Sequence, residues 1–296
     1  MSEWSVAQYG SVRQAVASTI GPGVEILRRS SIAGGCIAGG KRLDLSNGDA
    51  LFLKESTHLP VDMFVAEAEG LSLLQNDHLR VPRPLGWGRS GSSTFLLMEF
   101  MPTESRAHDY DRVLGVGLAR LHRGRTDRRA GLPFDNYIGS TPQRNTLCDS
   151  WIEFFRTQRI GYQVELARKR GILDATTAAN ALRVADKLGE LLPESEEKSL
   201  LHGDLWGGNV IVGPNGLPVL IDPAVYFGHR EADLAMTELF GGFSSGFYDA
   251  YENEWPLEPG YRDRRDLYNL YHMLNHLNIF GGSYLGSVRS IVRHYA

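Results

Sequence analysis

Short apolar runs separated by turn residues fill much of the first hundred positions, and this pattern predicts a β-rich segment. Asn47-Gly48 is a two-residue hairpin signal between two such runs. Helical spacing of apolar residues predicts helices over 4–18 and 61–74, and Pro82 and Pro84 are expected to break the chain. The predicted strands are 24–27, 42–45, 50–54 and 94–99.

Helical periodicity replaces this pattern after Met101-Pro102. We therefore predict an α+β fold with two lobes, an N-terminal lobe over 1–100 and a mainly helical C-terminal lobe over 101–296. The expected helices of the second lobe are 111–123, 150–170, 174–192, 231–239, 247–254 and 262–280.

One stretch of the second lobe, 201–222, combines a loop with a predicted hairpin. The apolar runs 210–212 and 217–221 flank the turn residues 213–216. In a hairpin, the residue before the first strand lies near the residue after the second, and here these are Asn209 and Asp222. An amide oxygen and a carboxylate suit a hard cation such as Mg²⁺.

Asp204 lies in the loop that leads into this hairpin, five positions before Asn209. The spacing D-x-x-x-x-N, with an Asp after the hairpin, is that of the phosphoryl-transfer site of protein kinases. The pattern predicts a phosphoryl-transfer site that contains Asp204, with Asn209 and Asp222 next to a cation.

Lys54 ends an apolar strand, and the following helix places Glu67 on one face with Phe64 and Leu71. A carboxylate within an apolar stripe needs a partner, because an unpaired buried charge is costly. Lys54 would supply that partner and hold the phosphates of a nucleotide, as in kinases. Glu69 is the alternative partner, since its neighbours on the helix are also apolar.

A glycine-rich turn precedes this strand. Glycine lets backbone N–H groups approach phosphates without a side-chain clash, so we expect this turn to cover a bound nucleotide. It lacks the Lys-Ser ending of a P-loop. We expect the backbone of Glu99, Phe100 and Met101, at the lobe junction, to meet adenine. The residues of the turn are Gly34, Gly35, Cys36, Gly39 and Gly40.

Composition narrows the class of protein. The chain has 296 residues, 42% hydrophobic and 22% charged, which fits an ordinary globular protein, and its net charge of −4 argues against nucleic-acid binding. We expect no secretory signal, because residues 1–10 lack a basic and an apolar region, and no membrane span, because no apolar run is long enough. Cys36 and Cys148 do not form a disulfide framework, so we expect a cytoplasmic protein. Cys36 is also a candidate redox-sensitive thiol, with an inert turn residue as the alternative.

The catalytic stretch departs from protein kinases. His202-Gly203-Asp204 has glycine where protein kinases have arginine, and Asp222-Pro223-Ala224 replaces Asp-Phe-Gly. Only ten residues separate Asp222 from Asp233, which leaves no room for a long activation loop. These differences indicate a small-molecule kinase with a permanently formed site.

The chain resembles the fructosamine kinase (ketosamine-3-kinase) family, a branch of the aminoglycoside phosphotransferase-like kinases. LHGDLWGGN and DPAVYFGHREADLAM are the specific segments. The matching pieces cover nearly the whole chain: GGCIAGG at 34–40, Lys54, Glu67, MEF at 98–100, LARLH at 118–122, DNYIGSTPQRN at 135–145, LLHGDLWGGN at 200–209, IDPAVYFGHREADLAM at 221–236 and LFGGF at 239–243.

The resemblance implies a bilobal protein-kinase-like fold and ATP- and Mg²⁺-dependent phosphorylation of the sugar 3-hydroxyl of ketosamines, free or on protein lysines. Carried over to this sequence, it makes Asp204 the catalytic base or hydroxyl-orienting carboxylate, and Asn209 and Asp222 the metal ligands. It also makes Trp206 and His229 substrate-pocket candidates, with packing under the catalytic loop as the alternative. Tyr226 is a further candidate, because it lies just beyond Asp222. His202 is expected to be structural, and Asp233 to brace the catalytic loop. A monomer or homodimer is expected.

Two other functions remain open. One is a kinase for another amine or sugar acceptor, such as an aminoglycoside or a choline-like compound. The other is a pseudokinase that binds nucleotide and acts as an interaction module.

Overall fold

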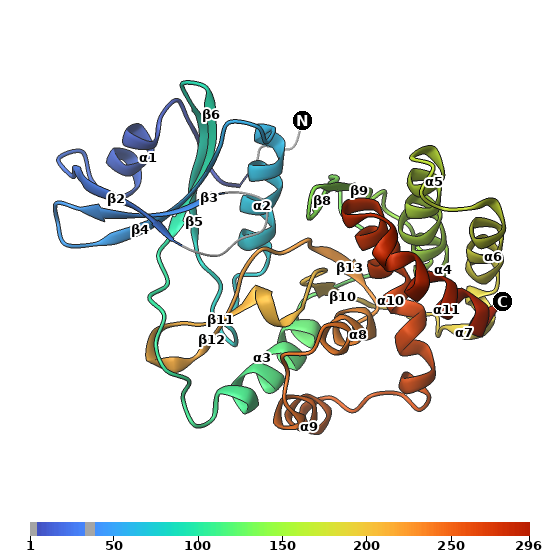
Figure 1. Cartoon of the computed structure of the whole chain (residues 1–296). Helices are drawn as coiled ribbons and strands as arrows, with labels where there is room; N and C mark the ends of the chain where they lie inside the picture. The colour runs from blue at the N-terminus through green and yellow to red at the C-terminus, as the bar shows by residue number, and fades with distance from the viewer. Residues whose placement is uncertain (1–4, 33–38) are drawn as a thin grey trace. The chain divides into compact units, whose positions relative to one another are not determined.

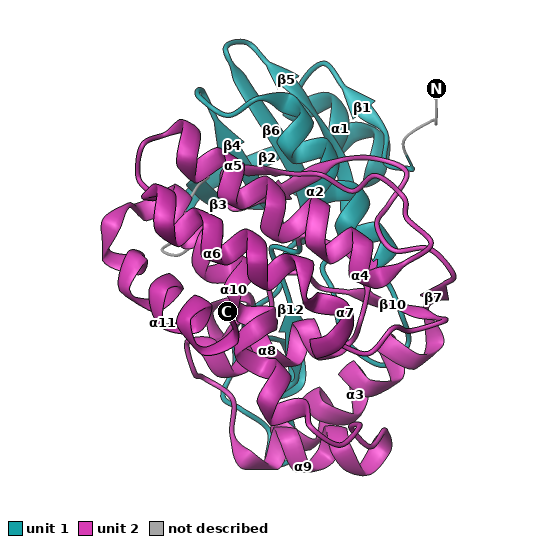
Figure 2. Ribbon diagram, turned by 90° about the vertical axis from the view of Figure 1, so that its right-hand side faces the viewer, with its two compact units in different colours: residues 1–110, 210–223 teal, residues 111–209, 224–296 magenta. Residues whose placement is uncertain are grey.

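The structure, a computed structural model, describes residues 5–32 and 39–296, and the chain divides into two compact units (Figure 2). Unit 1 comprises residues 1–110 and 210–223, and unit 2 comprises residues 111–209 and 224–296. The predicted 210–221 hairpin therefore belongs to the same unit as the N-terminal residues. The two lobes predicted from the sequence, 1–100 and 101–296, had placed this hairpin in the C-terminal lobe. The lobe boundary near residue 100 stays a prediction.

In the described part of unit 1, an almost wholly antiparallel sheet forms the framework (Figure 1). Alternate leucines of β3 and β4 pack with Val12 and Val16 of helix α1 (Val12–Thr19), so one face of the sheet forms a core. Helix α2 (Val61–Leu73) packs on β5 and β6. In spatial order, the strands are β1 (Gln8–Tyr9), β5 (Pro84–Ser90), β6 (Ser93–Glu99), β4 (Ala50–Ser56), β3 (Gly39–Leu45) and β2 (Ile26–Ile32).

The first helix begins later than predicted. Ser11 caps it, since its Oγ accepts a hydrogen bond from the Gln14 N–H at 3.1 Å. The residues before the cap form β1, which pairs in parallel with β5. Gly88 of β5 permits this approach, because a Cβ there would lie 1.9 Å from the Tyr9 carbonyl oxygen.

The sequence pattern missed β5. Pro84 was expected to break the chain, but it stands at the first position of this strand, where a missing N–H is tolerated. The other predicted strands of this region correspond to β2, β3, β4 and β6, with β2 lying later along the chain than predicted.

The predicted hairpin is present as β11 (Val210–Val212) and β12 (Pro218–Leu220), joined by a 3₁₀ turn over Pro214–Gly216. The Leu220 N–H donates to the Arg80 carbonyl at 3.0 Å. The Ala107 N–H donates to the Gly216 carbonyl, also at 3.0 Å. These bonds explain why the hairpin belongs to unit 1.

Unit 2 is mainly helical. The helix predicted over 150–170 is one run of α4 (Trp151–Phe154), a π-helical segment (Phe155–Gly161) and α5 (Tyr162–Lys169). The predicted 174–192 helix is divided into α6 (Ala175–Asp186) and α7 (Leu188–Leu191), and α11 (Leu285–Tyr295) was not predicted. The remaining helices match their predictions closely: α3 (Tyr110–Gly124), α8 (Glu231–Leu239), α9 (Ser245–Glu254) and α10 (Tyr261–Phe280). The first residue of α3, Tyr110, is also the last residue of the N-terminal part of unit 1.

Two small sheets of unit 2, neither of them predicted, support its loops. β10 (Lys198–Leu201) lies between β13 (Tyr226–Gly228) and β7 (Thr126–Asp127). β8 (Asn136–Ile138) and β9 (Thr141–Gln143) form a separate hairpin. Across the residues that the structure describes, no helix combines the length and apolar character needed to cross a membrane.

Candidate active site

In unit 1, one lysine joins two carboxylates. The Lys54 Nζ lies 2.6 Å from Oε1 of Glu67 and 2.5 Å from Oδ1 of Asp222. The predicted Lys54–Glu67 ion pair is therefore confirmed. Glu69, the alternative partner, instead accepts hydrogen bonds from Ser5 Oγ at 2.7 Å and the Val6 N–H at 3.1 Å.

The charges of this trio support one another. Burial alone would lower the pKa of the Lys54 ammonium, but the attraction of Glu67 and Asp222 outweighs burial and raises that pKa above its usual range. Burial raises the pKa of Glu67, and repulsion from Asp222 adds to this effect while Lys54 opposes it. The arrangement keeps a permanent cation beside a carboxylate that is 34% exposed.

Asp222 has an unusual backbone. Its φ is +54°, a left-handed conformation that few non-glycine residues adopt and that Asp tolerates better than most. The hairpin register pairs Val210 with Leu220, so Ile221, and not Asp222 as predicted, follows the second strand directly. The extra residue and the left-handed turn aim the Asp222 carboxylate at Lys54.

The described end of the glycine-rich turn lies next to Lys54. Gly40 is the cross-strand partner of Lys54, and cross-strand partners face the same side of a sheet. A Cβ on Gly40 would lie 2.7 Å from the Phe52 ring, so this position cannot take a side chain without displacing that ring. Gly39 pairs with Glu55. The other predicted residues of this turn, Gly34, Gly35 and Cys36, lie outside the described residues.

The predicted adenine-facing segment follows β6. The Glu99 N–H donates to the Arg83 carbonyl at 2.9 Å, and its side chain forms an ion pair with Arg80. The Arg42 guanidinium lies over the Phe100 ring at 4.8 Å, and Met101 is buried. Contact of Glu99, Phe100 and Met101 with a nucleotide base stays a prediction.

In unit 2, Asp233 braces the catalytic loop as predicted. Its carboxylate accepts hydrogen bonds from the His202 N–H at 2.7 Å and the Gly203 N–H at 2.8 Å. His122 Nε2 lies 3.2 Å from the same carboxylate. Burial would raise the pKa of Asp233, but the hydrogen bond and charge of His122 outweigh it and hold that pKa below its usual range.

A second contact fixes the same loop. The Ala224 N–H donates to the His202 carbonyl at 2.9 Å. Gly203 has a φ of +81°, and a Cβ there would lie 2.0 Å from the Ala224 carbonyl oxygen. His202 is fully buried, which agrees with its predicted structural role. The backbone that presents Asp204 is thus held from both sides.

Asn209 is oriented by Asp204, which lies five positions before it in the predicted motif. Its Nδ2 donates to the Asp204 carbonyl at 2.8 Å and to Asp204 Oδ2 at 3.1 Å. Because the amide nitrogen is committed, the Oδ1 atom is the one that Asn209 can present to a cation. An amide oxygen here and the Asp222 carboxylate in unit 1 are the donor types that Mg²⁺ prefers. Within the described residues, no cluster of three or more His, Cys, Asp or Glu side chains could hold a metal ion, and the role of Asn209 and Asp222 as metal ligands stays a prediction.

The three substrate-pocket candidates differ in exposure. Trp206 is partly exposed, and its ring lies against Gly208, where a Cβ would be 2.2 Å away. Tyr226 is buried beneath the Arg159 guanidinium at 4.0 Å, and burial raises its pKa to about 12. His229 is buried and lies 2.8 Å from the Tyr268 hydroxyl, and burial lowers its pKa to about 3. Substrate contact by these residues stays a prediction, and the structure gives the last two a packing role.

A buried polar network, which the sequence pattern did not indicate, supports the segment after Asp222. Gln143 Nε2 donates to the Ala224 carbonyl at 2.9 Å, and Asn136 Nδ2 donates to the Val225 carbonyl at 2.8 Å. Asn145 and Arg159 extend the network, with Arg159 Nη2 donating to Asn145 Oδ1 at 2.8 Å. The only indication in the sequence was that residues 135–145 resemble the fructosamine kinase family, and the sequence assigned no role to these residues.

Comparison with known structures defines the class of the fold. A thermostable mutant of aminoglycoside phosphotransferase APH(4)-Ia, crystallised with ADP and hygromycin B, superimposes with a TM-score of 0.62 at 17% identity, covering 96% of this chain and 99% of that one. A crystal structure from Haemophilus somnus that carries the provisional name fructosamine-3-kinase gives a TM-score of 0.87 at 28% identity, covering 98% of each chain. The fold is thus that of the protein-kinase-like phosphotransferases, with a β-sheet N-terminal lobe and a helical C-terminal lobe.

Sequence comparison gives the family. The model of the fructosamine kinase family matches residues 8–296. A probable ketoamine kinase of Synechocystis is 40% identical over 290 residues, which cover 98% of this chain and 97% of the relative. The chloroplastic protein-ribulosamine 3-kinase of Arabidopsis thaliana is 39% identical over 283 residues, covering 94% and 85%. The chain belongs to the fructosamine kinase family, and it is a kinase.

Proposed function

We propose that this kinase transfers the γ-phosphoryl group of Mg-ATP to the sugar 3-hydroxyl of ketosamines, both free and on protein lysines. The observation that carries the proposal is the Lys54–Glu67–Asp222 trio, in a chain whose relatives are named ketoamine kinase and protein-ribulosamine 3-kinase. A fixed cation between two carboxylates fits the binding of phosphates and a metal.

Each site residue then has a role that follows from its contacts. Bound Mg-ATP would supply the transferable phosphoryl group. Lys54, held by Glu67, binds phosphate oxygens, and Asp222 and Oδ1 of Asn209 are the metal ligands. Asp204 accepts or orients the proton of the acceptor hydroxyl, and the brace on its loop keeps it in place.

The product should be labile. Enolisation of the ketosamine towards C1, the carbon bonded to nitrogen, makes the C3 phosphate allylic, and it can leave as inorganic phosphate. Hydrolysis of the remaining imine then frees the amine. We expect ribulosamines to be at least as good substrates as fructosamines, since a shorter sugar enters an open pocket more easily. A cytoplasmic location and a monomeric or homodimeric state stay predictions.

Mass spectrometry tests the proposal. A synthetic ribulosamine or fructosamine is incubated with the enzyme and Mg-ATP and followed over hours. The expected result is the addition of one phosphate, which then disappears as free amine accumulates, and the matched control is the Asp204→Asn variant. Turnover of aminoglycosides or choline with none on any ketosamine would refute the proposal, and binding of ATP with no turnover of any acceptor would favour a pseudokinase.

A further inference from the structure

Five aromatic side chains of unit 2 form a continuous series, which we call the aromatic strip: Trp206, Phe240, His276, Phe280 and Tyr284. The Trp206 and Phe240 ring centroids lie 6.3 Å apart, and those of Phe240 and His276 lie 4.8 Å apart. His276 continues the series to Phe280 at 5.5 Å and to Tyr284 at 5.1 Å. These spacings are those of interacting aromatic pairs.

The strip begins at the catalytic loop. Trp206 lies two positions after Asp204. The backbone of this loop also touches the segment that carries Phe240, because a Cβ on Gly207 would lie 3.1 Å from the Gly241 carbonyl oxygen. Gly241 and Gly242 both have positive φ, and a Cβ on Gly242 would lie 3.0 Å from the Gly207 Cα. These glycines bring the Phe240 ring against Trp206.

Two rings of the strip are open to solvent. Four large hydrophobic side chains are exposed among the described residues, and two of them belong to the strip: Phe240 at 41% and Phe280 at 58%. An exposed aromatic surface that continues into a catalytic loop is typical of a ligand-binding site.

The strip also suits a cation at its middle. His276 Nδ1 lies 2.8 Å from the His272 carbonyl oxygen, so Nδ1 carries the proton and Nε2 is an acceptor. Burial lowers the pKa of His276, which keeps the ring neutral. A neutral ring flanked by aromatic faces attracts an ammonium group and does not repel it.

We propose that the aromatic strip binds the amine substituent of the ketosamine acceptor, the part of the substrate beyond the sugar. This inference rests on the proposed function and adds a specificity. The sugar lies at Asp204, the secondary ammonium follows along the strip, and Phe280 selects flat apolar substituents on the nitrogen.

Two synthetic ribulosamines that differ only on nitrogen test the proposal. Steady-state kinetics with N-(6-phenylhexyl) and N-hexyl ribulosamine and saturating Mg-ATP give the ratio of the two KM values, because a chain of this length can carry the ring from a sugar at Asp204 along the strip to Phe280. The wild-type enzyme should have the lower KM for the phenylhexyl compound. Phe280→Ala should shrink that ratio by roughly 2- to 10-fold, the range of aromatic contacts, and Phe280→Leu should shrink it less. The loss should fall on KM and not on kcat.

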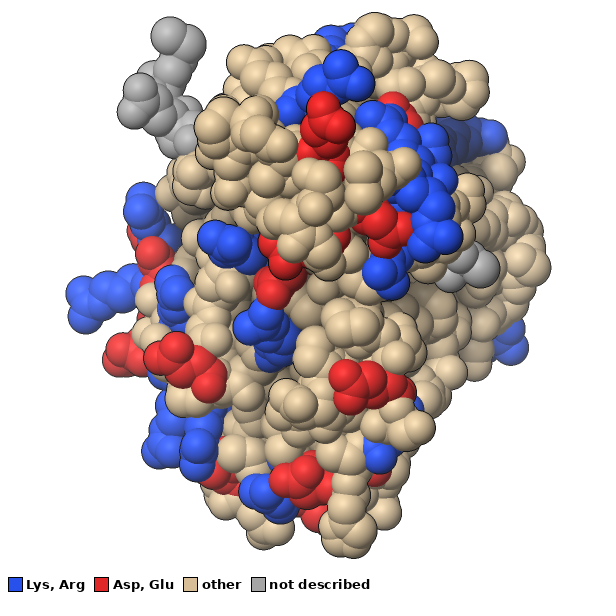
Figure 3. Space-filling model, turned by 90° about the vertical axis from the view of Figure 1, so that its left-hand side faces the viewer, with Lys and Arg blue, Asp and Glu red and all other residues tan. Residues whose placement is uncertain are grey.

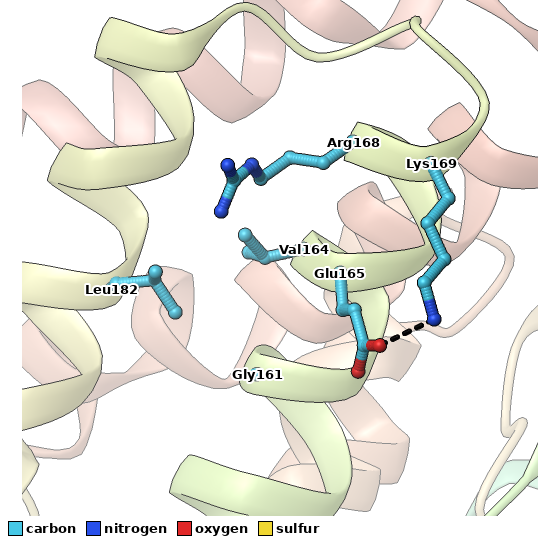
Figure 4. Close-up of a pocket in the computed structure, with 6 residues that line it drawn as sticks. All are labelled: Gly161, Val164, Glu165, Arg168, Lys169 and Leu182. Atoms are coloured by element: carbon cyan, nitrogen blue, oxygen red, sulfur yellow. Dashed lines mark hydrogen bonds and ion pairs between the residues drawn. The ribbon is translucent and has the colours of Figure 1, made fainter.

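Leu182→Ala is the matched control. Leu182 is 37% exposed, and it lines a cavity of about 410 Å³ between α5 and α6 whose other lining residues also lie outside the strip (Figure 4). This variant should keep the wild-type ratio. A wild-type ratio near one, or a Phe280→Ala ratio equal to that of wild type, overturns the role of the strip while the proposed function stands. No turnover of either compound overturns the proposed function and the strip together.

Discussion

Unit 1 and unit 2 each contain one carboxylate to which we assign a role in phosphoryl transfer, and each unit holds its carboxylate by different means. In unit 1, Asp222 is held by the charge of Lys54 and is one-third exposed. In unit 2, the loop of Asp204 is held by main-chain hydrogen bonds to the buried Asp233 and to Ala224. The first arrangement depends on the balance of charge, and the second depends on buried hydrogen bonds that tolerate little change.

The charged side chains on the surface do not show this difference between holding by charge and holding by buried hydrogen bonds. On the face drawn in Figure 3, Lys and Arg side chains gather with Asp and Glu between them. On β2 and β3, for example, Arg28 and Arg42 both bond Asp44 at 2.7 Å. Such exposed pairs add little stability.

The largest effect should come from replacing Asp204, the proposed catalytic residue of unit 2. Asp204→Asn should lower kcat by roughly 10²–10⁴-fold, the usual contribution of a positioned base. ATP affinity should change little, because the role proposed for this side chain is at the acceptor hydroxyl and not at the nucleotide. Kinetics on the best ketosamine, with ATP binding by calorimetry, measure both. Near-wild-type turnover would show that another group does this work.

In unit 1, Asp222→Asn should act on the nucleotide. Mg²⁺-dependent ATP binding should weaken by at least about 10-fold, the smallest loss typical of groups around a bound metal. Lys54 keeps its Glu67 partner, so the fold should survive. Titration of ATP with and without Mg²⁺ separates this effect from that of Asp204→Asn. Equal metal dependence in the variant and the wild type would remove Asp222 from the metal site.

The sequence predicted the parts of both units that are local. Lys54 and Glu67 are 13 positions apart on adjacent elements, and a carboxylate in an apolar helical stripe indicated the ion pair. The hairpin was visible from its turn residues. Its register was missed by one residue, because Asp222 takes a left-handed conformation that no pattern of apolar positions encodes.

The long-range parts could not be predicted in the same way. Gln143 meets Ala224 across 81 positions, and a glutamine on a short strand looks like any exposed polar residue. Arg159 would be expected on a helix surface, yet it is fully buried in a π-helical segment among aromatic rings. Such partners become visible only when the chain has folded.

A matched pair of helix α2 variants sharpens the comparison further. Glu67→Gln should lower kcat/KM for ATP by roughly 10-fold, because a hydrogen bond to a neutral amide orients an ammonium less well than a carboxylate does. Glu69→Gln is the control, since Glu69 bonds Ser5 and Val6 and not Lys54. Kinetics at varied ATP compare the two. Equal losses in both variants would mean that the Lys54–Glu67 pair contributes only to stability.

The effect of acid, which is measured as a shift in Tm and not as a change in rate, should arise in unit 2. Burial, then Arg230 and Arg264, lower the pKa of His229 from 6.5 to about 3, and Glu231, 3.9 Å away, is already bonded to Arg264. Between pH 3 and pH 6.5, the His229 ring is therefore protonated in the unfolded chain and neutral in the folded chain. The stabilising effect of the neutral ring is complete above pH 6.5 and is lost as pH falls towards 3, up to roughly 2 kcal/mol at pH 5.

His229→Asn should remove this slope, because the asparagine Oδ1 can accept from the Tyr268 hydroxyl without titrating. Thermal unfolding at pH 7.5 and pH 5.0 gives the change in Tm for each protein, and the variant should lose a few degrees less than wild type on acidification. His294→Asn, at an exposed position of α11, is the control and should keep the wild-type change. Since the signal is a difference of differences, a uniform loss of stability from the substitution cancels. If the wild type and His229→Asn lose the same number of degrees, the acid sensitivity of unit 2 does not depend on this buried imidazole.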